Sequence, residues 1–180
     1  MIYLNDVFWI LVVLFAIIGF FRGAAKEMLV ILSVIVALFF ITLMMSNSFV
    51  KNELAGVAGG KILFGIQLLL IIVLVIAGYQ TPYRKKLPIK DQISANPRVE
   101  KILGGIVGGV NGYLIIGTIW YYMHKAAYPI SFISSPENAG AEILEKTNEL
   151  MKMFPAQILQ PTTIYFAIGI AITIILVLYI

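Results

Sequence analysis

ILGGIVGGVNGYLIIGTIWYYM, residues 102–123, is the stretch that decides the fold of this chain. Within it, Gly104, Gly108 and Gly112 recur at four-residue spacing, and two further glycines double the stripe. In water, an interior glycine costs a helix about 1 kcal/mol relative to alanine. In lipid, helices associate instead through small residues that let their backbones approach. The stretch therefore predicts a membrane helix that carries a glycine packing face.

The composition places the whole chain among membrane proteins. Of its 180 residues, 61% are hydrophobic and only 12% are charged, and the mean hydropathy is +0.97. Ordinary soluble domains are about one-quarter charged. There is no cysteine, which excludes a disulfide framework, a thiol nucleophile and a thiolate metal site. We therefore expect an all-α, polytopic integral membrane protein with a single membrane domain over residues 1–180.

Other apolar runs are also long enough to be spans, because crossing a hydrocarbon core of about 30 Å takes about 20 residues. The chain predicts four to five transmembrane helices, at about residues 2–21, 28–45, 62–79, 102–123 and 161–180. The first run opens with an acid and lacks the basic start of a secretory signal. We therefore expect it to be retained as a span.

A polar connection lies between the last two runs, and it contains a helical pattern. Ser134 or Ser135 before Pro136 offers an N-cap followed by a first-turn proline. Apolar and charged residues then alternate at helical spacing. This predicts an amphipathic helix at about residues 137–153, suited to the membrane surface.

The basic residues predict the orientation. Eight of the 13 Lys and Arg residues lie in the 22–27 hinge and the 80–101 loop. The positive-inside bias places both segments in the cytoplasm. The N-terminus and the amphipathic helix are then extracytoplasmic. We expect Arg84, Lys85 and Lys86 to contact lipid headgroups, and because topology and lipid contact explain this cluster, we expect no nucleic-acid partner.

Three charged residues border the first two apolar runs: Asp6, Arg22 and Glu27. They could form a proton or ion relay, since ionisable groups near lipid often do. Their positions outside the central apolar stretches favour an interfacial, helix-end role instead. Arg22 is expected to pair with a carboxylate, and Glu27 is a candidate because the chain can fold back across a hinge at Gly23.

The polar residues inside the runs do not predict a reaction. Asn111 lies beside the glycine stripe, where its amide would seek a partner across helices, so we expect it to serve helix packing. His124 has no second ligand at metal spacing. Phosphate-binding loops, hydrolase elbows and zinc-protease motifs are absent from the sequence. We expect no catalytic, cofactor or metal site and no enzymatic activity.

Two sequence units together resemble the colicin V production protein (CvpA) family. DVFWILVVLFAIIGFFRGAAKE at residues 6–27 is similar to its opening D-x-(apolar)-G-x-x-R-G-x-x-x-E unit, and RVEKILGGIVGGVNG at residues 98–112 to its later glycine-repeat unit. The resemblance implies a protein of the bacterial inner membrane linked to colicin V production, secretion and envelope homeostasis. Family members are usually four-span proteins, so residues 161–180 would be a fifth or a re-entrant segment.

Function is narrowed to two main hypotheses. The first is a membrane scaffold, whose glycine face packs against sister subunits or a secretion partner. The second is an oligomeric channel, with Asp6, Arg22 and Glu27 setting the electrostatics of its mouth. An accessory subunit of a larger membrane complex is a third possibility. All three imply membrane lipids and a homo-oligomer or other membrane proteins as partners, with no cofactor and no small-molecule substrate.

Overall fold

The computed structural model describes residues 4–48, 50, 60–80, 96–131 and 133–179. All regular elements within these residues are helices, so the all-α expectation is confirmed. Four of them are long and apolar enough to cross a membrane. These four helices are α1 (Leu4–Arg22), α2 (Ala24–Ser46), α3 (Lys61–Gln80) and α5 (Pro97–Lys125).

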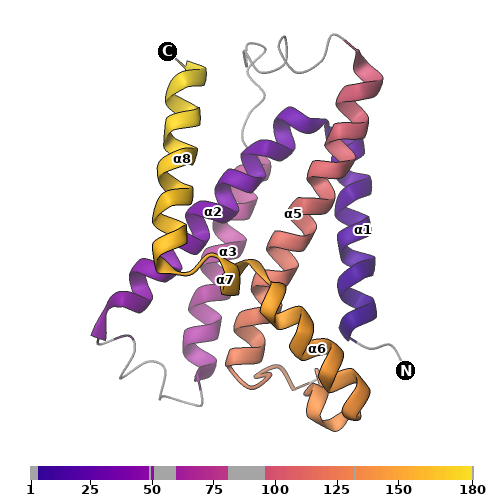
Figure 1. Ribbon diagram of the computed structural model, residues 1–180, viewed down its shortest axis with the longest axis vertical. Helices are drawn as coiled ribbons and strands as arrows, with labels where there is room; N and C mark the ends of the chain where they lie inside the picture. The colour runs from indigo at the N-terminus through magenta and orange to yellow at the C-terminus, as the bar shows by residue number, and fades with distance from the viewer. Residues whose placement is uncertain (1–3, 49, 51–59, 81–95, 132, 180) are drawn as a thin grey trace.

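The spans form a bundle in which α2 occupies the centre and α1 and α5 form a tight pair (Figure 1). Helix α2 contacts α3, α5 and the C-terminal helix α8 (Pro161–Tyr179). The main apolar core lies where these helices meet. Its buried members are Val30, Val34, Ala37, Leu38, Ile41, Ile71, Val75, Ile115 and Ile164.

The observed bounds differ from the sequence expectation at two helix starts. The hinge expected at 22–27 is a single residue, Gly23, so that Glu27 falls in the first turn of α2. Helix α5 begins five residues before the expected span. Its start is fixed locally, because the Asn96 side chain accepts a hydrogen bond from the Arg98 N–H and Pro97 occupies the first turn.

The polar connection after α5 folds against the end of the bundle where α1 begins (Figure 1). It contains a short 3-10 turn (η3, Pro136–Asn138) and two helices, α6 (Ala141–Met153) and α7 (Pro155–Ile158). The expected N-cap at Ser134 or Ser135 was wrong for α6. Ser135 precedes only the 3-10 turn. Gly140, with φ of 103°, interrupts the helical conformation between this turn and α6.

Helix α6 has the expected amphipathic character, but its apolar side packs on protein. Met151 is buried and Phe154, just after α6, is fully buried in an aromatic cluster with Phe8 and Trp120. The ring centroids of Phe154 and these two residues lie 5.2 and 5.4 Å apart, respectively. Trp120 belongs to this core and is 2% exposed, because Phe154 packs against it.

Helix α8 occupies the place of the expected fifth span. It is 19 residues long, as is α1, and its sequence contains no charged residue. It runs along α2 from the level of α7 toward the end of the bundle where α1 meets α2 (Figure 1). Ile164 and Ala171 are buried on its inner side, whereas Phe166 and Ile170 are exposed.

Candidate functional site

The glycine stripe of α5 is packed against α1 of the same chain. An added Cβ on Gly108 would lie 2.5 Å from the Phe15 carbonyl oxygen and 2.8 Å from Gly19 Cα. A Cβ on Gly112 would lie 2.7 Å from Phe15 Cβ, and one on Gly104 would collide with the Gly19 carbonyl oxygen. Such distances leave no room for any side chain. Gly19, on α1, is as essential to this contact as the stripe itself.

Gly23 turns the chain from α1 into α2 at the end of this contact between α1 and α5. Its φ of 85° lies in the left-handed region that residues with a Cβ rarely adopt. Its N–H still donates to the Gly19 carbonyl at 2.9 Å, which closes α1. The turn also brings Arg22, the last residue of α1, back over Glu27 in the first turn of α2.

Four residues from four helices form a polar cluster beside the turn. The Arg22 guanidinium pairs with Glu27 Oε1 at 2.5 Å and donates to the Tyr79 carbonyl at 3.1 Å. Asn111 Nδ2 donates to Glu27 Oε2 at 2.7 Å and to the Glu27 carbonyl at 2.9 Å. The Tyr79 hydroxyl approaches Glu27 Oε2 at 3.5 Å, and the Arg22 guanidinium carbon lies 4.2 Å from the Tyr79 ring centroid. One carboxylate thus ties α1, α2, α3 and α5 together.

Burial distinguishes the members of this cluster. Glu27 and Asn111 are 0% exposed, while the Arg22 side chain is 22% exposed. Asn111 Oδ1 is buried without a hydrogen-bond partner among the described residues, as is Thr118 Oγ1 about two turns further along α5. A buried carboxylate in a membrane protein is held there only by a paired charge and hydrogen bonds.

The structure separates the charges that the sequence grouped. Asp6 is exposed in the first turn of α1, about 24 Å along the helix from Arg22 at 1.5 Å per residue. Glu27 lies in the first turn of α2, as expected for a helix-end residue, and the expected pair with Arg22 is confirmed. Its side chain is fully buried, however, because residues from three other helices cover it. Asn111 contacts this buried pair in addition to lying on the packing face.

Helical periodicity could have revealed the burial of Glu27. Residues 27, 30, 34, 37 and 41 follow alternating spacings of three and four and all face the core. Asn111 shares a similar stripe with Gly104, Gly108, Ile115 and Thr118 on α5. Sequence reasoning missed Tyr79 altogether, since nothing distinguishes it from a tyrosine at a membrane interface.

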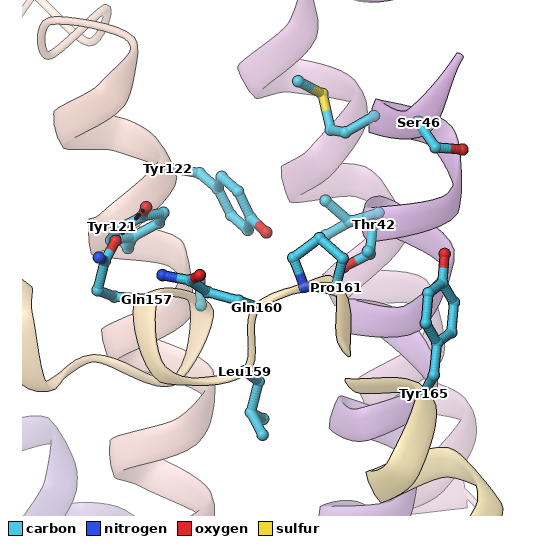
Figure 2. Close-up of a pocket in the computed structure, with 12 residues that line it drawn as sticks. Thr42, Ser46, Tyr121, Tyr122, Gln157, Leu159, Gln160, Pro161 and Tyr165 are labelled. Carbon is cyan, nitrogen blue, oxygen red and sulfur yellow. Dashed lines mark hydrogen bonds between the residues drawn. The ribbon is translucent and has the colours of Figure 1, made fainter. Parts of the chain in front are cut away.

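A cavity of about 360 Å³ lies near the other end of the spans (Figure 2). It opens between the last turns of α2 and the end of α5, and the chain from α7 into α8 closes its third side. Figure 2 shows the Tyr122 hydroxyl pointing into the gap from α5, with Thr42 across from it on α2, whereas the Ser46 hydroxyl points away from the gap. Its other lining residues are Ile41, Met45, Tyr121, Ala156, Gln157, Leu159, Gln160, Pro161 and Tyr165.

The expected lipid-contact residues Arg84, Lys85 and Lys86 lie outside the described residues. Within the described part of the chain, no group of three or more His, Asp or Glu side chains could hold a metal ion. Comparison with known proteins gives no match to a family model, to a curated protein or to a solved structure.

Proposed function

We propose that this chain is a CvpA-like protein of the bacterial inner membrane that acts as a non-enzymatic scaffold in colicin V production, secretion and envelope homeostasis. In this proposal the N-terminus and α6 face outward. The supporting observation is that the two CvpA-like units meet. Gly19 and Gly23 of the first unit contact Gly104 of the second, and Glu27 of the first binds Asn111 of the second.

This contact explains why the two units would occur together in one family. Each unit alone would leave a polar or poorly packed surface in lipid, where interhelical contacts depend on close backbone approach and paired polar groups. Together they form a continuous seam from Gly112 to Gly23. The contact is therefore a structural reason for the two units to occur together, although they are far apart in the sequence.

The same contact favours a scaffold over a channel. Arg22 is paired with Glu27 and packed on Tyr79, so it is engaged within the chain and is not projecting toward a pore. The glycine face is covered by α1, so sister subunits or partner proteins must bind elsewhere. Residues on the uncovered side of α1, such as Trp9, Val13 and Ile17, are exposed to lipid or to such a partner.

The proposal can be tested in a colicin V-producing bacterium that lacks its own CvpA-family protein. Expression of this chain should restore colicin V production. Gly108→Leu should abolish the restoration, because it disrupts the seam between the two units. Gly65→Leu is the matched control, since nothing lies within 4 Å of a Cβ at this position on α3. Failure of the wild-type chain, with normal membrane levels, would refute the CvpA assignment.

A further inference from the structure

A second cavity, of about 380 Å³, adjoins the one in Figure 2. It lies between the start of α3 and the end of α5, and the two cavities share Met45, Tyr121 and Tyr122 as lining residues. Each volume falls within the range of about 300–1,000 Å³ that is typical of ligand sites. The two cavities therefore flank one wall, formed by the paired tyrosines of α5.

Both cavities lie where the membrane interface must be. Ser46 ends α2, Lys61 begins α3 and Lys125 ends α5, so the surrounding walls belong to the terminal turns of three spans. Both cavities are lined mainly by apolar atoms, with Leu63 and Phe64 in the second, and each also has a few polar side chains. A molecule that fits must be apolar along most of its length and polar at one end.

A row of polar groups crosses the wall between the cavities. The Tyr121 hydroxyl donates to Gln157 Oε1 at 2.7 Å, and the Lys125 ammonium lies 5.5 Å from the Tyr121 ring centroid. Because Gln157 uses its oxygen for this bond, its amide N–H groups remain as donors. Lys125 is the one charged residue among the described residues that line either cavity. The row thus offers donors and a positive charge, with no carboxylate.

We propose that the wall of Tyr121 and Tyr122 is a binding site for one anionic phospholipid. Its phosphate binds Lys125 and the Gln157 amide, and its acyl chains occupy the apolar parts of the two cavities. A phosphate provides only acceptors, which matches the donors of this row. The site is distinct from the expected headgroup contacts at 84–86 and does not depend on the scaffold role.

The test is a lipid titration of the purified chain in a neutral detergent, followed by native mass spectrometry and thermal unfolding. Phosphatidylglycerol should bind at one molecule per chain and raise the unfolding temperature more than phosphatidylcholine with the same acyl chains. Lys125→Gln should weaken phosphatidylglycerol binding about fivefold, which corresponds to ~1 kcal/mol for one lysine at an anionic surface. Ala156→Phe, which fills the cavity of Figure 2, should also weaken binding.

Lys101→Gln is the matched control, because Lys101 is an exposed lysine on the same helix near its other end. It should leave phosphatidylglycerol binding unchanged. Equal binding of the two lipids, or an equal effect of Lys101→Gln and Lys125→Gln, would overturn the proposal in favour of nonspecific boundary lipid. Inorganic phosphate should not compete. If it does, and Ala156→Phe has no effect, the site binds small anions and the proposal is wrong.

Discussion

Glu27 has a carboxylate that is withdrawn from solvent and held by side chains from three other helices. One of its oxygens faces the Arg22 guanidinium, and the other accepts from the Asn111 amide. Removing a single partner from such a pair leaves an uncompensated charge in a medium of low dielectric constant. Replacing both partners with apolar groups removes that penalty together with the attraction.

Glu27→Leu should therefore destabilise the protein by about 3–5 kcal/mol, as is typical when one partner of a buried ion pair is removed. The double variant Arg22→Leu/Glu27→Leu should recover part of this loss. Both effects can be measured as free energies of unfolding in detergent. Glu142→Gln, which breaks an exposed pair with Lys146, should have little effect. A Glu27→Leu variant as stable as wild type would show that the pair contributes nothing.

The pairing of α1 with α5 depends on backbone approach along the seam described above. Gly108→Ala should destabilise the protein, because its Cβ would meet the Phe15 carbonyl and Gly19 Cα, which are rigid backbone atoms. Gly108→Leu should be worse and should separate the helices. Thermal unfolding in detergent measures both. Gly65→Ala and Gly169→Ala, at helix positions with open space, serve as controls. Unchanged stability of both Gly108 variants would contradict the seam.

The sequence predicted the positions of helices where the local pattern of residues is strong. The apolar runs located the four long helices, because a length of about 20 residues is set by the bilayer. The glycine stripe indicated a packing face but not its partner, since sister copies and α1 offer the same small residues. Gly19, four residues before Gly23, was the residue in the sequence that could have identified α1 as the partner. The α6 boundary was misjudged because Ser135 and Pro136 form a helix start that Gly140 then interrupts.

For the whole molecule, the arrangement of the spans makes the orientation testable with two labels. The positive-inside bias predicts that residues 80–101 are cytoplasmic and 124–160 extracytoplasmic. In intact cells, an impermeant thiol reagent should label Glu145→Cys and not Lys86→Cys. Lysis should expose the second site. The native chain has no cysteine, so background labelling is absent. Labelling of Lys86→Cys in intact cells would invert the proposed topology.

A scaffold and a channel also differ in what the purified molecule does. With its glycine seam closed and Arg22 paired, the chain should show no discrete conductance in planar bilayers under voltage or tension. Arg22→Leu/Glu27→Leu should stay silent as well, because its charges do not line a pore. Conductance steps that require oligomers and change with this double variant would support the channel hypothesis instead.

The contacts along the seam must form in a fixed order while the chain is being synthesised. Arg22 and Glu27 are five residues apart, so their pair can form as soon as the first hairpin leaves the ribosome. Asn111 comes 84 residues after Glu27, and the glycines that contact Gly19 emerge only shortly before it. During that interval the carboxylate is already neutralised by its neighbour, while the α1 surface around Gly19 faces lipid alone. Insertion of α5 is therefore the step that closes the contact between α1 and α5, before α8 packs on α2.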